Sequence, residues 1–351
     1  MRNPLNEFAA PTPSTPSAPV SPSTLHRIFI GPDGLRAGWG ILIFIVLFFS
    51  LVRAAGFLAH LIHLLPTRAP GTVRPDPGPL FTIISEAIPF LVVALVSWIM
   101  SRIERRPVGV YGLGGQRKLP LFLVGAFWGA LFLSMLVLIL WKTGLLLIDT
   151  RLLFGSDVLR YAAAWLGGFL VVGLLEEYLT RGYLQYTLTR GLAGFYRWAL
   201  KTPHSTALGF WSAALIFSIL FGLGHGSNPG ESPIGLFAAG LAAMVFCLSL
   251  WRTGSLWWAI GFHTTWDWAQ SFLYGVADSG TMVKFHLLAT HPVGKPILSG
   301  GATGPEGSIF ILPILLLVSL VIIYTLPRTN PLADDRGDLF TLKTPNLDAE
   351  A

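Results

Sequence analysis

Charged residues are scarce in this chain of 351 residues, where Asp, Glu, Lys and Arg together make up only 12%. Ordinary soluble domains carry about 25%. Hydrophobic residues make up 53% of the chain, and the mean hydropathy is +0.63. Several apolar runs approach about 20 residues, which is the length needed to span the hydrocarbon core of a bilayer. The composition therefore argues against a soluble protein and predicts an all-α, polytopic membrane helix bundle.

Cysteine is nearly absent, because Cys247 is the only one and lies inside an apolar run. One cysteine excludes a disulfide within the chain, and no histidine stands near Cys247 to support thiol catalysis. The net charge of +6 does not indicate a nucleic-acid partner. The basic residues stand between apolar runs, where they orient the protein and contact anionic lipid.

Two motifs of hydrolytic enzymes are also missing. The chain contains no H-E-x-x-H, which excludes zinc-protease chemistry of that type. It contains no G-x-S-x-G, which removes the nucleophile elbow of the serine hydrolases.

The order of apolar and polar segments predicts how the chain is organised. A disordered Pro/Ser-rich tail is expected first and a polar tail last, with about eight membrane helices between them. The predicted segments are the tail 1–36, three membrane helices within 37–157, a polar-motif core 158–276, a loop 277–307, the last membrane helix 308–326 and the tail 327–351.

The eight predicted spans alternate with connections in which Lys and Arg are unevenly distributed. These residues are more frequent in the connections that share a side with both termini. This bias predicts cytoplasmic termini and a protein of the plasma (inner) membrane. The predicted spans are residues 37–65, 80–101, 119–141, 161–180 or beyond, 206–224, 232–251, 254–275 and 308–326.

The run Glu176–Arg181 brings three charges to the end of the fourth apolar run. One charge at the centre of a membrane helix costs about 2.5–3.5 kcal/mol, so these side chains need partners. Neighbouring helical residues point about 100° apart, so Glu176 and Glu177 face different surroundings. Glu177 and Arg181 share a face at i, i+4, which predicts a structural ion pair. Glu176 is left without a local partner and is the better candidate for chemistry.

Two further pairs lie in later runs at the same spacing. Phe221 and His225 share a helix face at the end of the fifth run, where a histidine can also be merely interfacial. His263 and Asp267 share a face well inside the seventh run, where such polar groups are rare and expensive. A structural alternative is that Asp267 bonds to Trp side chains or to Arg181.

One glutamate, two histidines and an aspartate from three helices suffice for peptide hydrolysis. A buried carboxylate can act as general base for water, and histidines can orient that water or stabilise the oxyanion. Alternatively, Glu176, His225 and His263 match the three protein ligands of a catalytic zinc site. The sequence is compatible with both a zinc-bound water and a metal-independent glutamate mechanism.

The three motifs, in this order, resemble those of the CAAX protease and bacteriocin-processing (CPBP, or Abi) family of membrane proteases. They are Glu176-Glu177-x-x-x-Arg181, Phe221-x-x-x-His225 and His263-x-x-x-Asp267, and the stretch from Arg252 to His263 is also similar. The resemblance implies that residues 158–276 are the catalytic core of an intramembrane endopeptidase.

The resemblance also implies roles for the motif residues. Glu176 would activate the water, with help from His225, and His263 with Asp267 would stabilise the oxyanion or complete a metal site. Glu177 and Arg181 would position the first motif. Eukaryotic members usually carry Asn at the position of Asp267. An ionised Asp267 would repel an oxyanion, so it must be protonated or paired with a cation or metal.

The substrate implied by the resemblance is a protein or peptide, lipidated or embedded in the bilayer. In eukaryotic members it is a prenylated protein that loses the last three residues of a CaaX tail. Two other functions use similar residues. A non-enzymatic Abi-type immunity or scaffolding protein would be expected to carry a degraded motif set. A transporter would be expected to show internal repeats, and none is evident.

The motifs meet at one depth only if the fourth helix is longer than its hydropathy suggests. Glu176 lies near the end of the apolar run, whereas His225 ends the next run at the opposite side. At about 1.5 Å per residue the mismatch exceeds roughly 10 Å. We therefore predict a fourth helix that continues past Arg181, to about Thr189, and ends near Gly191 or Gly194.

Overall fold

The computed structural model describes residues 28–31, 34–64 and 76–327 of the chain. Most of the predicted N-terminal tail and nearly all of the C-terminal tail lie outside the described residues. The chain divides into two units, Met1–Arg36 and Ala37–Ala351. In the first unit, Ile30–Gly31 (β1) pairs antiparallel with Gly34–Leu35 (β2).

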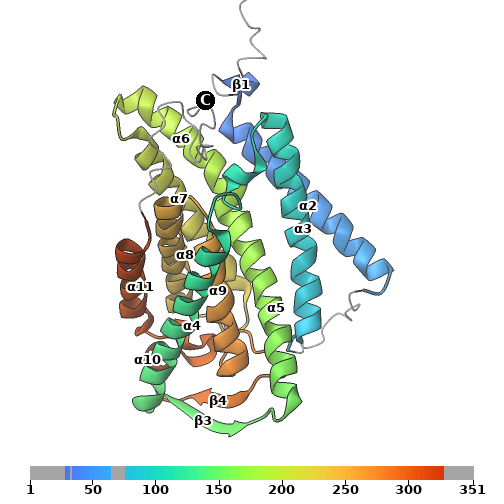
Figure 1. Ribbon diagram of the computed structural model, residues 1–351, viewed down its shortest axis with the longest axis vertical. Coiled ribbons are helices and arrows are strands. Elements are labelled where there is room, and N and C mark those ends of the chain that lie inside the picture. The colour runs from blue at the N-terminus through green and yellow to red at the C-terminus, as the bar shows by residue number, and fades with distance from the viewer. Residues whose placement is uncertain (1–27, 32–33, 65–75, 328–351) are drawn as a thin grey trace, which may run out of the picture. The chain divides into compact units, whose positions relative to one another are not determined.

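The second unit is a bundle of α-helices, so the predicted all-α class is confirmed (Figure 1). Six helical segments among the described residues are long and apolar enough to cross a bilayer, not the eight that we predicted. Their bounds are Ala37–Leu61 (α2), Pro79–Glu104 (α3), Lys118–Lys142 (α4), Ser156–Leu200 (α5 to α6), Ser205–Ser227 (α7 with the turn η3) and Pro233–Thr253 (α8).

The two remaining predicted spans are shorter helices. The seventh forms α9, Trp257–Asp267, which continues as the π-helical segment η4, Trp268–Leu273. The eighth forms α11, Ile311–Thr325. Each is shorter than the roughly 20 residues that a bilayer requires. Trp258, Ala259 and Ile260 of α9 are fully buried in protein, so their apolar character serves the core of the bundle rather than contact with lipid.

The predicted extension of the fourth helix is confirmed. Helical structure runs from Ser156 to Leu200, as α5 (Ser156–Tyr178), the π-helical segment η2 (Leu179–Leu184) and α6 (Gln185–Leu200). The predicted ending near Gly191 or Gly194 is wrong, because α6 continues to Leu200. A Cβ atom on Gly191 would lie 2.6 Å from the Cβ of Ala37, so this glycine allows α6 to approach α2 closely.

Helix α9 lies between α4 and α5 (Figure 1), and glycines allow its backbone to approach that of α4 closely. A Cβ atom on Gly125 of α4 would lie 2.1 Å from the carbonyl oxygen of Trp258, and one on Gly129 would lie 2.2 Å from that of Phe262. From the other side, a Cβ atom on Gly261 would lie 2.1 Å from the carbonyl oxygen of Phe122. Small residues spaced in this way let helix backbones approach in membranes. This contact fixes the helix that carries His263 and Asp267.

The segment 277–307, predicted as a loop, has structure of its own. Its strand β4, Leu288–Pro292, pairs antiparallel with β3, Leu146–Arg151, with an irregularity between Ile148 and Thr150. The indole nitrogen of Trp165 on α5 donates to the carbonyl oxygen of Lys284 over 3.0 Å. The segment also contains α10 (Pro296–Ser299) and the 3-10 turns η5 (Gly301–Thr303) and η6 (Pro305–Gly307). Elsewhere in the chain, the 3-10 turn η1 (Val108–Tyr111) connects α3 to α4.

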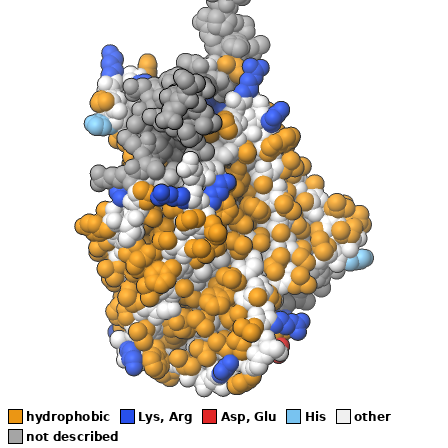
Figure 2. Space-filling view, viewed as in Figure 1, with side chains coloured by type: hydrophobic (Ala, Val, Ile, Leu, Met, Phe, Trp, Pro, Cys, Tyr) orange, Lys and Arg blue, Asp and Glu red, His pale blue; other side chains and the backbone are white. Residues whose placement is uncertain are grey.

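The outer surface of the helices is apolar. Figure 2 shows hydrophobic side chains over most of one face, with Lys and Arg side chains gathered mainly towards its two ends. Phe49, Leu91 and Phe127 are each more than half exposed at mid-helix positions. An apolar band between basic ends suits a hydrocarbon core between two headgroup layers. With six candidate spans, the chain is an integral membrane protein.

Candidate active site

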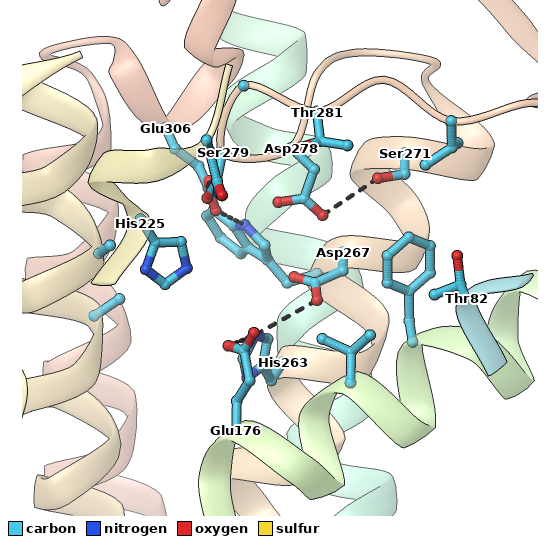
Figure 3. Close-up of a pocket in the computed structure, with 18 of the residues that line it drawn as sticks. Thr82, Glu176, His225, His263, Asp267, Ser271, Asp278, Ser279, Thr281 and Glu306 are labelled. Atoms are coloured by element: carbon cyan, nitrogen blue, oxygen red, sulfur yellow. Dashed lines mark hydrogen bonds and ion pairs between the residues drawn. The ribbon is translucent and has the colours of Figure 1, made fainter. Parts of the chain in front are cut away.

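A cavity of about 530 Å³ opens among α3, α5, α7, α8 and α9. The segment 277–307 closes part of its wall. All four predicted catalytic residues, namely Glu176, His225, His263 and Asp267, line this cavity. Figure 3 shows their side chains around one space, although they come from three separate helices. The structure therefore brings the three sequence motifs together.

The two adjacent glutamates point into different surroundings, as their helical spacing predicts. The side chain of Glu177 is fully buried, and its Oε1 lies 2.7 Å from Nη1 of Arg181. This confirms the predicted ion pair. The side chain of Glu176 is 32% exposed and faces the cavity. One glutamate is thus held by the protein, while the other is accessible to a substrate or a water molecule.

Arg181 is enclosed by groups that match a guanidinium. Its guanidinium carbon, Cζ, lies 5.0 Å from the ring centre of Phe221 and 5.3 Å from that of Phe246, and both distances are within the range of cation–π attraction. Its Nε donates to the carbonyl oxygen of Ala243 over 3.4 Å. These contacts join α5–η2 to α7 and α8. Phe221, which we predicted as a supporting residue, packs its ring against the guanidinium of Arg181.

The π-helical segment η2 follows directly after the two glutamates. Such segments carry one extra residue per turn and occur often at functional sites. At its centre, Gly182 has φ −79° and ψ −119°, outside the helical region. A Cβ atom on Gly182 would lie 2.8 Å from Cδ2 of Tyr178, so a larger residue would displace that ring. The break sets the direction in which the chain leaves the Glu176–Arg181 turn.

His263 stands among three carboxylates. Its Nδ1 lies 3.0 Å from Oε1 of Glu177. Its Nε2 lies 3.4 Å from Oδ2 of Asp267 and 3.7 Å from Oε2 of Glu176. Ionised carboxylates only accept hydrogen bonds, so a proton must lie between Nε2 and these oxygens. This proton is compatible with two of the states expected from the sequence, namely a protonated Asp267 and an Asp267 carboxylate paired with a protonated His263 ring.

His225 directly follows α7, as the first residue of the turn η3, and its ring faces the cavity (Figure 3). Its Nδ1 lies 2.8 Å from the carbonyl oxygen of Phe221. A carbonyl can only accept, so Nδ1 carries a proton and donates it. In the neutral ring Nε2 then keeps its lone pair. The ring centre lies 4.8 Å from that of Phe221, so Phe221 contacts both Arg181 and His225.

Comparison with known protein families supports this grouping. Residues 158–269 match the family of type II CAAX prenyl endopeptidases that are Rce1-like. This segment is a CAAX prenyl endopeptidase family domain. No curated protein and no solved structure matches the chain. The family is one of proteases, and membership implies that the membrane-embedded domain has this activity.

The CAAX endopeptidase domain contains all of the predicted site residues, from Glu176 to Asp267. It does not contain the whole cavity. Phe81 and Thr82 of α3 and the residues of segment 277–307 also line it, and they lie outside the matched range. The predicted site residues therefore all belong to the family domain, whereas other parts of this chain form much of the surrounding wall.

Sequence reasoning missed several residues of the cavity wall. Asp278 accepts a hydrogen bond from Ser271 over 3.2 Å. Glu306 accepts from the indole nitrogen of Trp266 over 2.8 Å and from Ser279 over 3.0 Å. These acidic residues lie in the segment predicted as a loop, where carboxylates are normally solvated, so the local sequence gives no signal for them.

The predicted metal ligands Glu176, His225 and His263 line the same cavity. Among residues 28–31, 34–64 and 76–327, no three His, Cys, Asp or Glu side chains are grouped so that they could hold one metal ion. The trio Glu176, His225 and His263 therefore does not match a zinc site as arranged. Zinc stays a prediction, and no step below passes through it.

Proposed function

We propose that this protein is an intramembrane endopeptidase in which Glu176 activates water for attack on a peptide carbonyl. The observation that carries the proposal is the cavity in which a glutamate that is one-third exposed faces two histidines inside a CAAX endopeptidase domain. The substrate is a peptide segment presented within or beside the bilayer, such as a lipidated protein tail. We further propose that both termini lie in the cytoplasm and that the plasma membrane holds the protein.

In the proposed mechanism, water binds between Glu176 and His225. The Nε2 lone pair of His225 accepts one hydrogen bond and orients the water, while Glu176 takes its other proton. The new C–O bond forms, and the carbonyl oxygen becomes an oxyanion. The proton held between His263 and Asp267 is available to stabilise that oxyanion. Glu176 then returns its proton to the leaving nitrogen as the C–N bond breaks.

Asp267 acts in this mechanism through His263 rather than on the oxyanion. Its Oδ2 lies 3.4 Å from Nε2 of the ring, and Glu177 holds the other ring nitrogen. This arrangement removes the objection that an ionised aspartate would repel the oxyanion. The chain thus differs from relatives with Asn at this position, because its carboxylate balances the charge of the imidazole.

The proposal is tested by cleavage of lipidated and unmodified peptides, with mass spectrometry to locate the cut. The purified full-length protein in lipid nanodiscs should release two fragments with one new carboxyl and one new amino terminus. Incorporation of ¹⁸O from labelled water into the carboxyl product would support direct attack by water. Absence of cleavage across lipidated, unmodified and membrane-spanning peptides would contradict the proposed function.

Replacement of His225 by alanine should lower kcat at least about 100-fold, because the water loses one of its two partners. KM should change little, and the protein should stay folded. The matched control is His291→Ala. His291 is half-exposed on β4 and pairs with Asp149 outside the cavity, so its loss should leave cleavage unchanged. Equal activity of both variants would remove His225 from the mechanism.

Chelation should leave the cleavage rate unchanged, because the donor groups are not arranged for one metal ion. The measurement is activity after dialysis against 1,10-phenanthroline, together with the zinc content of the same sample. Loss of activity that returns on addition of zinc would establish the alternative, in which Glu176, His225 and His263 regroup as ligands.

A further inference from the structure

The cavity wall carries more carboxyl groups than basic groups. Among the described lining residues there is no Lys or Arg, and the basic groups are the imidazoles of His225 and His263. Arg181 lies behind Phe221 and Phe246, where it is already paired with Glu177. The acidic lining residues are Asp76, Glu86, Glu176, Asp267, Asp278 and Glu306.

Two of these carboxylates are held in fixed positions by donors from the protein. Asp278 is held by Ser271, and Glu306 is held by Trp266 and Ser279. Both come from segment 277–307, which lies outside the matched family domain. In Figure 3 they stand on one side of the space, while Glu176 and His263 stand on the other. A substrate bond beside Glu176 would therefore have neighbouring residues beside Asp278 and Glu306.

The carboxyl groups of Asp267, Asp278 and Glu306 have no Lys or Arg partner among the described residues. The side chain of Asp267 is only 8% exposed, and its one ion-pair partner among the described residues is the His263 ring. Burial raises the pKa of Asp278 well above its ordinary value, and the charges of Asp267 and Glu306 raise it further. Buried carboxylates of one sign repel each other, so a cation between them would be bound favourably.

We propose that the cavity selects peptides with a Lys or Arg side chain within two residues of the scissile bond, and that Asp278 and Glu306 are the residues that determine this specificity. The inference rests on the proposed protease function. An extended chain advances about 3.3–3.6 Å per residue, so such a side chain stays within the cavity when the bond lies beside Glu176. A tail that ends in a free carboxylate three residues after the bond, as a CaaX tail does, would instead bring like charge to this wall.

The test uses matched peptides that differ at one position and the full-length protein in nanodiscs. Each of the two residues on either side of the cleaved bond is set in turn to Lys, norleucine or Glu. At the peptide position whose side chain lies beside Asp278 and Glu306, kcat/KM should be at least about tenfold higher with Lys than with Glu. The reason is that Lys is attracted to these carboxylates, whereas Glu is repelled by them. The norleucine peptide should give an intermediate value.

Amide variants remove the charge of Asp278 and Glu306 while keeping the hydrogen bonds that hold these side chains. In Asp278→Asn and Glu306→Gln an oxygen remains to accept from Ser271 and from Trp266, so the wall should keep its shape. The double variant should reduce the Lys-to-Glu ratio to near one, with both rates taken relative to cleavage of the norleucine peptide by the same variant. The matched control is Asp149→Asn, which removes a carboxylate on β3 that is 45% exposed and should leave the ratio as it was.

Failure of this inference and failure of the protease function give different results. Cleavage of the norleucine peptide without preference for Lys over Glu would overturn the charge selection and leave the protease intact. If no peptide is cleaved, binding to the Glu176→Gln variant decides the inference through the anisotropy of labelled peptides. Tighter binding of the Lys peptide than of the Glu peptide, lost in the Asp278→Asn/Glu306→Gln variant, would support it; equal binding would overturn it.

Discussion

Replacement of Glu176 by glutamine should abolish peptide cleavage while the protein stays folded. The amide cannot take a proton from water, and general base catalysis typically contributes 100- to 10,000-fold, so kcat should fall by about that factor. The side chain is one-third exposed, and its ion-pair partner is the His263 ring at 3.7 Å, so little of the fold depends on its charge. The measurement is single-turnover cleavage of a neutral peptide, with thermal unfolding of the same sample.

The control for Glu176→Gln is Glu86→Gln. Glu86 also lines the cavity, but it belongs to α3, and Ser85 donates to it at a long 3.4 Å. Its replacement removes a similar charge from the same space without touching the reacting groups. Cleavage by Glu86→Gln should therefore stay near that of the unmodified protein. If both variants lose activity alike, the effect is one of charge in the cavity and Glu176 is not the base.

The division of labour between Glu176 and Glu177 could be predicted from local sequence. Helical geometry alone separates two adjacent side chains by about 100°, and it pairs Glu177 with Arg181 on one face. The extension of the helix past Arg181 followed from the need to bring His225 and Glu176 to one depth. These predictions depend on spacing within one or two helices, and the structure confirms the Glu177–Arg181 ion pair and the longer helix.

Other features depend on contacts that no local pattern encodes. Hydropathy cannot distinguish a helix that faces lipid from one that is buried in protein. The sequence therefore predicts α9 as a membrane span, whereas its apolar side chains pack against α4 and α5. Asp278 and Glu306 reach the cavity only because segment 277–307 folds back over the bundle. The contact of Glu177 with His263 joins residues 86 positions apart and was equally hidden.

Glu177 connects the structural and the chemical parts of the site. The same oxygen, Oε1, lies 2.7 Å from Arg181 and 3.0 Å from Nδ1 of His263. The sequence suggested a purely supporting residue. The structure shows that the ion pair also holds the ring that faces Glu176 and Asp267. Stability and activity should therefore both depend on Glu177, and suitable variants should separate them.

Replacement of Arg181 by methionine should destabilise the protein by about 3–5 kcal/mol, the usual effect of removing one partner of a buried ion pair. Both side chains are almost completely buried, so water cannot take the place of the guanidinium. The contacts with Phe221 and Phe246 lose their cation as well. The measurement is the free energy of unfolding in a reversible detergent titration, with Arg197→Met on α6 as the control for loss of an arginine.

The double variant Glu177→Leu/Arg181→Met distinguishes the two roles of the pair. Replacing a whole buried ion pair by apolar groups of similar volume is often neutral, so much of the lost stability should return. Activity should not return, because Nδ1 of His263 then has no carboxylate to hold the ring. A double variant that recovers both stability and cleavage would show that His263 needs no support from Glu177. Recovery of neither would mean that the polar pair itself is required for the bend at η2.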